Sequence, residues 1–401
     1  MPAPRFQNND QFGAPGVYIR EIAPSAPIRG IMRNTIGIVG ECVRGPVGRV
    51  IDITSFQRFV DVFGGRDKGT GGTILGKIWK ALQAKRFGRL AIVRACAAAA
   101  VSASFDWETA AGGAGTAVLR VAATSPGTWG NDVQFKVADA SNGGANSFNL
   151  TIRYLGKDTT YQNLSINSTD DNLAITLGND DANVVVLTKL ANGRPVNTAA
   201  ATDGADAEMF VNLGETVASF TSVAGTDGTI ADTDFTGTGK GMELINAYAG
   251  VGVCLVAGRS NSAVKTKILA LAAVAAERMW LACPDSETAT DATYITEVGA
   301  LRDDRLVHCF NHIYIVDPTT DEIIVDEPHV LMASILSQTE PDVHPAVIEN
   351  ADYTKGVVRL YNSLSLSQVD ALDLAGISFV NRDLDQNGNQ IIRFGNGVTS
   401  D

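Results

Sequence analysis

The chain has no apolar run long enough to cross a lipid bilayer, which argues against a helical membrane protein. Residues 1–30 also lack the continuous apolar core of a signal peptide. With 401 residues and 45% hydrophobic content, the chain is long enough to bury a core in two or three domains. We therefore expect a soluble protein that is made and kept in a cytoplasm until something releases it.

Cysteine is scarce, and its spacing argues against a metal knuckle. None of the five cysteines belongs to a C-x-x-C pair. Cys254 lies in an apolar run and Cys96 follows another, so both are expected to be small core residues. The odd number leaves room for a free or an intermolecular thiol. Disulfide pairing stays open for all of them, namely Cys42, Cys96, Cys254, Cys283 and Cys309.

Sequence signatures of catalysis are missing as well. There is no G-x-S-x-G elbow, no Walker-type phosphate loop and no dinucleotide fingerprint. His308, Cys309 and His312 could be read as metal ligands. Adjacent residues of a strand point to opposite faces, however, and a fourth ligand is missing. A zinc site is therefore not expected there.

The segment 383–394 opens with Asp-x-Asp-x-Asn-Gly, as calcium-binding loops do. Phe394 occupies the position where such a loop needs a bidentate glutamate. Asn387 and Gly388 are better explained as the turn of a β-hairpin. The sequence therefore predicts no catalytic residue, no cofactor and no metal, and the protein is not expected to be an enzyme.

Charge is distributed unevenly along the chain. Residues 1–100 carry 15 Lys and Arg against 6 Asp and Glu, whereas the net charges of residues 101–238 and 239–401 are −10 and −11. No helix-turn-helix, zinc-finger or base-stacking pattern accompanies the basic part, so nucleic acid is not expected as a partner. The opposite charges can attract each other within one fold or between copies, where they favour head-to-tail contacts.

Strands and helices are predicted to alternate in two separate parts of the chain. In the first part the expected elements are a strand at 35–40, helices at 55–63 and 74–84, and a strand at 90–93. The first of these helices should bury Phe56, Phe59, Val60 and Phe63. In the second part we expect helices at 242–248, 263–278, 291–301 and 330–336, strands at 251–256, 280–283, 307–310 and 313–316, and the hairpin at 379–392.

The intervening residues 101–238 have a different composition, rich in Thr, Asn, Asp, Gly and Ser. Short strand-like runs separated by turn signals such as Asn142-Gly143 and Asp227-Gly228 predict an antiparallel β-domain or sandwich. The expected fold is thus an α/β core domain, a mixed sheet flanked by helices, interrupted by an inserted β-domain. We assign residues 31–100 plus 239–401 to the core and residues 101–238 to an outward-facing insertion.

Residues 1–30 are expected to form an extended N-terminal arm. Pro15-Gly16 and the prolines at 24 and 27 bracket a short strand-forming run. Such a run either closes its own domain as an edge strand or adds a strand to a neighbouring subunit. The residues assigned to this subunit-linking arm are Val17, Tyr18, Ile19, Arg20, Glu21 and Ile22.

Four segments, in this order, resemble contractile tail sheath proteins of myovirus-type bacteriophages, a family shared with contractile bacteriocins and related injection systems. Individually the motifs are short, and their shared order gives the resemblance its specificity. They are Pro-Gly-Val-Tyr-Ile-Arg-Glu at 15–21, the run 35–40 followed by Arg-Gly-Pro-Val-Gly at 44–48, the run 56–65, and Ser-Pro-Gly-Thr-Trp-Gly-Asn-Asp at 125–132.

The resemblance implies a virion structural protein that forms a homo-oligomeric helical sheath. Copies would stack as rings around an inner tail tube protein, linked by strand-adding arms, and contraction would drive the tube through the host envelope. Baseplate and tail terminator proteins would be further partners, without nucleic acid or membrane insertion. Assembly would take place in the host bacterial cytoplasm, before release in the phage tail.

The end of the chain departs from the family pattern. Residues 392–399 resemble the strand and loop that lead into the family's C-terminal, tube-contacting domain, but the chain stops at Asp401. That domain is therefore expected to be absent from this chain. Two other classes stay open. An α/β enzyme would need a cleft with convergent polar groups, and a surface or receptor-binding protein would use the acidic β-domain.

Overall fold

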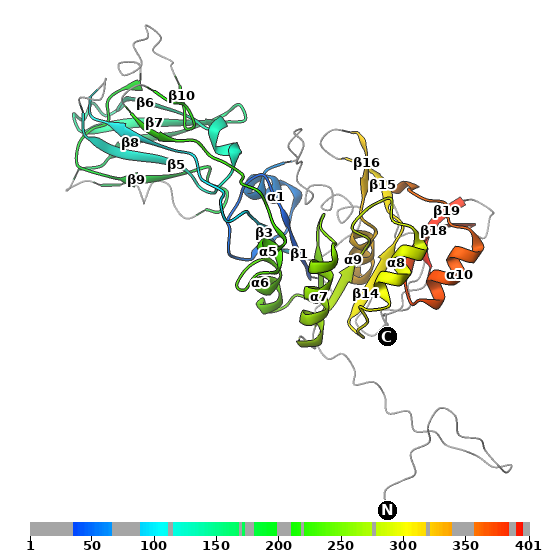
Figure 1. The fold of residues 1–401 in the computed structure, drawn as a ribbon. Coiled ribbons are helices and arrows are strands. Elements are labelled where there is room, and N and C mark those ends of the chain that lie inside the picture. Colours follow the sequence, from blue (N-terminus) through cyan, green and yellow to red (C-terminus); the bar gives the residue numbers. More distant parts are fainter. Residues whose placement is uncertain are drawn as a thin grey trace, which may run out of the picture.

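The computed structural model describes residues 35–65, 89–110, 115–167, 171–172, 180–198, 210–217, 220–274, 278–317, 321–338, 357–384 and 390–395. A mixed sheet with helices forms one part, and two smaller antiparallel sheets lie at one end of the elongated molecule (Figure 1). No described helix is long and apolar enough to span a membrane. The arm residues 17–22 and the helix expected at 74–84 lie outside the described residues.

The mixed sheet has eight strands in the order β19-β18-β14-β13-β12-β1-β3-β2. Neighbouring strands are parallel, except for the antiparallel pairs β18–β19 and β2–β3 at its two edges. The central strand β1 pairs Ile36 with Leu90 of β3 and with Val253 of β12. The strands are β1 (Thr35–Glu41), β2 (Ile51–Ile53), β3 (Arg89–Ala95), β12 (Val253–Val256), β13 (Met279–Ala282), β14 (Leu306–Phe310), β18 (Ser378–Leu384) and β19 (Gln390–Gly395).

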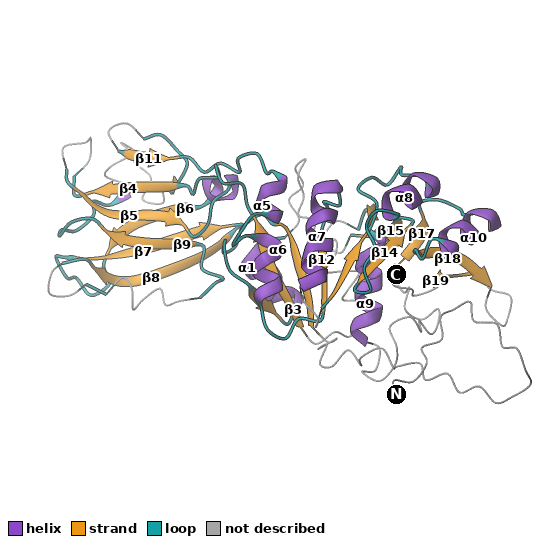
Figure 2. Cartoon of the chain, turned by 60° about the horizontal axis from the view of Figure 1, so that its bottom comes forward, coloured by secondary structure: helices purple, strands orange, loops and turns teal. Residues whose placement is uncertain are grey.

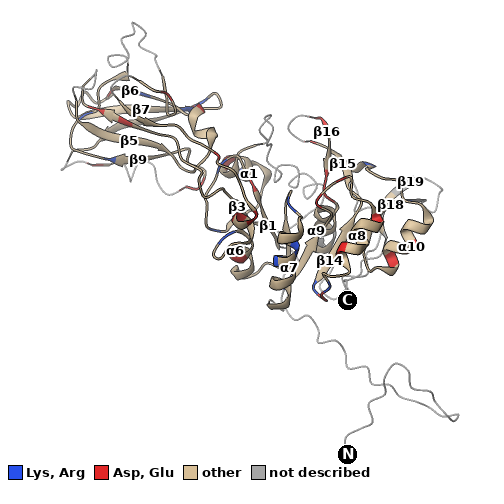
Figure 3. Cartoon of the chain, viewed as in Figure 1, with Lys and Arg blue, Asp and Glu red and all other residues tan. Residues whose placement is uncertain are grey.

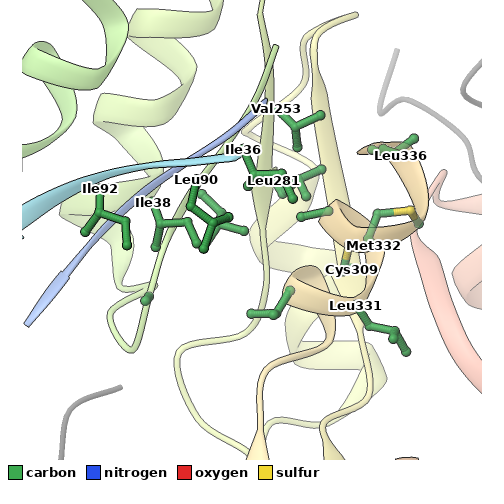
Figure 4. Close-up of a cluster of buried hydrophobic side chains, with 14 of the residues drawn as sticks. Ile36, Ile38, Leu90, Ile92, Val253, Leu281, Cys309, Leu331, Met332 and Leu336 are labelled. Carbon is green, nitrogen blue, oxygen red and sulfur yellow. The ribbon is translucent and has the colours of Figure 1, made fainter. Parts of the chain in front are cut away.

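Helices cover both faces of this sheet because its central strands are apolar on both sides. On one face Ile36 and Ile38 share a core with α1 (Phe56–Phe63) and α9 (Pro328–Gln338), as Figure 4 shows for α9. On the other face Val39 and Trp280 pack with α5 (Asp232–Thr236), α6 (Gly241–Ala247) and α7 (Ser262–Val274). The helices α8 (Asp291–Val298) and α10 (Leu366–Leu374) pack together at the β18 end.

Close packing fixes a glycine in the central strand. A Cβ atom at Gly37 would lie 2.8 Å from side-chain atoms of both Ile245 and Val251. Such distances are shorter than real packing contacts, so a larger residue would push α6 away from the sheet. Gly37 therefore sets how closely α6 approaches β1.

The chain between β3 and β12 forms two four-stranded antiparallel sheets (Figure 2). They share one core, in which Trp107 stacks on Phe220 with ring centroids 4.6 Å apart. One sheet, ordered β11-β4-β5-β9, contains β4 (Ser104–Glu108), β5 (Ala117–Ala123), β9 (Val185–Lys189) and β11 (Thr221–Val223). The other, ordered β10-β6-β7-β8, contains β6 (Gln134–Asp139), β7 (Ser147–Tyr154), β8 (Lys157–Ser165) and β10 (Val211–Asn212).

Most predicted elements are confirmed, with corrections at several ends. The helix at 291–301 stops at Val298, where Gly299 follows, and the one at 263–278 does not include Arg278, which lies in a loop. Arg278 instead donates hydrogen bonds to the carbonyls of Asn246 and Tyr248. In α1 the fully buried residues are Phe59, Val62 and Phe63, whereas Phe56 and Val60 are half-buried.

The strand expected at 313–316 does not join the main sheet. As β15 (Ile313–Val316) it forms a separate antiparallel sheet with β16 (Ile323–Asp326) and β17 (Val357–Leu360). Asn311, just before it, adopts φ 75°, a left-handed conformation that turns the chain away from β14. The hairpin of β18 and β19 is confirmed, while its expected turn at Asn387-Gly388 lies outside the described residues.

Candidate functional site

The residues considered as metal ligands around residue 308 are buried side chains. The Nε2 atom of His308 donates to the Leu301 carbonyl over 2.8 Å, and its Nδ1 atom accepts from the Tyr294 hydroxyl over 3.2 Å. Cys309 and His312 are buried beside it. Within the part of the chain that the structure describes, no three His, Cys, Asp or Glu residues are grouped for metal binding.

The cysteine thiols show no sign of activation. Four of the five are buried, whereas Cys96 is only half-buried, so the prediction of a core residue is wrong for Cys96 and confirmed for Cys254. Burial raises the pKa of Cys254 to about 12 and that of Cys283 well above its ordinary value. A thiol that stays protonated is a poor nucleophile. All five cysteines are free.

Ligands of α/β proteins usually bind where the strand order reverses, at the carboxyl ends of the strands. Here that place lies between β1 and β12, at the loop 258–260. The Gly258 amide donates to the carboxylate of Glu327, with 2.9 Å to Oε2, and the Ser260 amide donates to Asp285 over 2.7 Å. Carboxylates of the chain therefore occupy the amide groups that would bind a phosphate elsewhere.

The motif segments 44–48 and 125–132 meet at the junction between the mixed sheet and the antiparallel sheets. Arg94 of β3 joins them from the sheet side. Its guanidinium donates to the carbonyls of Gly45 over 3.0 Å, Pro126 over 2.8 Å and Val43 over 3.4 Å. The Gly45 amide in turn donates to the Ser125 hydroxyl over 3.0 Å. With Arg94 only 5% exposed, these bonds are shielded from water.

Two chain crossings, residues 96–103 and 224–231, connect the two parts and are tied to each other. Val101 and Thr226 exchange a pair of backbone hydrogen bonds of 2.9 and 3.0 Å. Asn131 likewise exchanges two bonds with Gly225, of 3.0 and 2.7 Å. A Cβ atom at Gly225 would lie 2.3 Å from the Gly127 carbonyl oxygen, so only glycine fits this crossing.

The segment 125–132 is capped by an acidic side chain from the second crossing. Asp227 accepts from the Thr128 amide over 2.9 Å and from its hydroxyl over 2.6 Å. Trp129 is buried at the same place, and the Arg44 guanidinium lies over its ring and over that of Tyr154, at 5.7 and 5.3 Å from the centroids. Backbone, cation–π and carboxylate contacts thus hold the junction together.

Part of the uneven charge is balanced within the chain at this junction. Arg58 of α1 forms an ion pair with Asp180 over 2.9 Å, and Arg49 pairs with Asp181. The pKa of Asp180 is lowered by the Ala182 amide and by Arg58. Because these side chains are between 28% and 58% exposed, each pair contributes little to stability. The pairs connect α1 and the segment before β2 to Asp180 and Asp181.

A groove of about 510 Å³ lies beside these pairs, and we call it the waist groove. Its described walls are α1, the end of the β7–β8 hairpin and residues 180–185. Tyr154 and Tyr161 supply aromatic surface. The charged residues that line the groove are Arg44, Arg58 and Lys157 together with Asp61 and Asp180. The arrangement suits contact with another polypeptide more than chemistry.

The motif 125–132 was recognisable in the sequence, whereas the residues that hold it, Arg94 and Asp227, were not. Arg94 stands inside the otherwise apolar run Leu-Ala-Ile-Val-Arg-Ala, and a charge in a buried strand was the signal that could have identified it. Asp227 was assigned only to a turn. Neither residue is near the motif in sequence, so their meeting depends on tertiary structure.

Comparisons with known proteins identify the fold. No protein-family model matches the sequence, and no curated protein matches it. A sheath tail protein from Desulfitobacterium hafniense is similar with a TM-score of 0.53 and 13% identity, over 94% of this chain and 74% of that chain. A sheath tail protein from Listeria innocua is similar with a TM-score of 0.55 and 12% identity, over 90% of this chain and 67% of that chain. The chain therefore shares the fold of these sheath tail proteins.

Proposed function

We propose that this protein is the structural subunit of a contractile tail sheath. The observation that supports the proposal most is the similarity to two sheath tail proteins over 94% and 90% of the chain. Copies would polymerise as stacked rings around an inner tail tube, and contraction would drive the tube through the host envelope. The free energy would come from new contacts between copies, without an enzymatic step.

The domain assignment belongs to this proposal. Residues 101–238 would form an inserted, outward-facing domain, and residues 31–100 with 239–401 the α/β core. The two antiparallel sheets between β3 and β12, connected by only two crossings, support an insertion. Residues 1–30 would be the arm that links subunits through Val17–Ile22.

Partners and location follow from the same proposal. The inner tail tube, baseplate and tail terminator proteins would contact the assembled sheath, and assembly would take place in the host bacterial cytoplasm before release in the phage tail. A receptor-binding role for the acidic β-domain is the less supported alternative. The similarity extends over both parts of the chain, whereas a receptor module would need only residues 101–238.

Deleting residues 1–25 tests the role of the arm. The variant should keep the circular dichroism spectrum and melting temperature of the full chain, because a linking arm would contribute its strand to another copy. It should lose polymerisation, since strand addition between copies would be removed. Sedimentation velocity of the variant and the full chain at matched concentrations measures the fractions of polymer and of single subunits. Loss of folding would show instead that the arm belongs to its own domain, and unchanged polymers would refute the linking role.

A further inference from the structure

The helix α10 exposes a leucine stripe on its outer face. Leu366 and Leu374 are 77% and 90% exposed, and Asp370 is exposed between them. Spacings of four and eight residues place all three on one side of the helix. The opposite side buries Leu372 against β18 and α8. A pair of exposed leucines on a short helix is a feature of docking surfaces.

Leu155 at the rim of the waist groove is exposed and conformationally strained. It lies with Gly156 in the two-residue turn between β7 and β8, has φ 50° and is 80% exposed. Among the described residues, the other non-glycine positions with positive φ are Asn163, Asn311 and Asp321, residue types that tolerate this region. Leu155 is unfavourable for the free subunit because its backbone is strained and because its apolar side chain is exposed to water. Both features point to a function in binding.

The groove rim at Leu155 and the leucine stripe carry opposite charges. Lys157 is exposed beside Leu155 on the groove rim, and Asp370 is exposed within the leucine stripe. Residues 361–377, which include α10, contain acidic residues but no Lys or Arg, and Figure 3 shows the acidic colour on this helix. Opposite charges facing one another raise the association rate and fix the register of a contact.

The positions of α10 and the waist groove suit a contact that repeats from one copy to the next. The helix α10 lies at the end of the molecule farthest from the antiparallel sheets, whereas the groove lies between those sheets and the core (Figures 1 and 2). A contact between two different surfaces of identical subunits is heterologous and generates rings or filaments.

We propose that α10 of one copy docks in the waist groove of a neighbouring copy. Leu366 and Leu374 enter the groove against Leu155 and the tyrosine rings, and Asp370 pairs with Lys157. This inference rests on the proposed self-assembly and names one of its contacts. It leaves the strand-adding arm as a separate link.

Leucine substitutions test the contact. The double variant L366Q/L374Q should raise the critical concentration for polymerisation at least tenfold while the monomer keeps its melting temperature. L155N should also weaken polymerisation, yet keep or raise the melting temperature, because asparagine accepts positive φ. The matched control is V274Q, which replaces an equally exposed apolar residue, 80% exposed, at the end of α7. It should polymerise as the unmodified chain does.

Charge reversal tests the pairing. K157E and D370K should each weaken polymerisation, and the chain carrying both should recover most of it, because every copy presents both surfaces. Normal polymers from L366Q/L374Q would overturn this inference and leave the sheath proposal standing. A lower melting temperature of that monomer would also overturn it, by showing that the leucines pack within their own chain. Absence of polymers from the unmodified chain would contradict both proposals.

Discussion

Lowering the pH from 7 to 4.5 should unfold the α/β part of the protein through its buried histidines. Burial lowers the pKa of His308, His312 and His329 to about 4. In the unfolded chain a histidine has a pKa of about 6.5, so between these values the unfolded state binds more protons and stability falls as the pH falls. Each histidine can lower the free energy of unfolding by up to about 3 kcal/mol. The total free energy of unfolding of a domain is typically about 5–15 kcal/mol, so three such losses together are comparable with it.

Urea unfolding at a series of pH values measures this effect. The free energy of unfolding should decrease most steeply between pH 6 and 4.5 and level off below the folded pKa values. H308Q should reduce the slope by roughly a third, because it removes one of the three titrations. Glutamine can still accept from Tyr294 and donate to the Leu301 carbonyl, so the variant should fold. Equal stability at pH 7 and pH 5 would contradict the assignment of neutral buried histidines.

Replacing Arg94 by methionine should loosen the junction between the mixed sheet and the antiparallel sheets. The variant removes the arginine bonds to the carbonyls of Val43 and Gly45. It also removes the one to Pro126, whose carbonyl keeps a 3.3 Å bond from the Trp129 indole. An unsatisfied buried acceptor costs about 1–3 kcal/mol, so the expected loss from the Val43 and Gly45 carbonyls is at least about 2 kcal/mol. Methionine keeps much of the side-chain volume, which limits the cavity contribution.

Arg58 provides a matched control at the same junction. In its ion pair with Asp180 the two side chains are 39% and 55% exposed, so R58M should cost less than about 1 kcal/mol. Urea unfolding compares the two variants, and limited proteolysis of residues 96–103 and 224–231 reports opening of the crossings. The proposed role of Arg94 is wrong if R94M loses no more stability than R58M and resists protease equally.

The periodic parts of the fold were predictable because their burial pattern follows from local spacing. The helix expected at 55–63 forms at 56–63. Ser55 is its N-cap and accepts from the Arg58 amide, and Gly64 with φ 80° ends it. The two-sided apolar run of β1 likewise indicated a central strand. Helix ends without a strong sequence signal were less predictable, because tertiary hydrogen bonds decide them. An example is the end of α7, which was expected at Arg278.

The junction could not be predicted from spacing. Its contacts join residues far apart in sequence, as between Arg94 and Pro126 or between Thr128 and Asp227. The separate sheet of β15 was also missed, because a single left-handed residue, Asn311, redirects an apolar strand without changing its pattern. Charge counts predicted attraction between basic and acidic parts, and the Arg58–Asp180 pair shows that some of this attraction is satisfied within one chain.

Electron microscopy of the purified full chain at high concentration tests the central claim most directly. The sheath proposal predicts hollow tubes or stacked rings with helical order, with a lumen wide enough for an inner tube. A population of stable monomers without rings or tubes, from a chain whose C-terminus is intact, would contradict it.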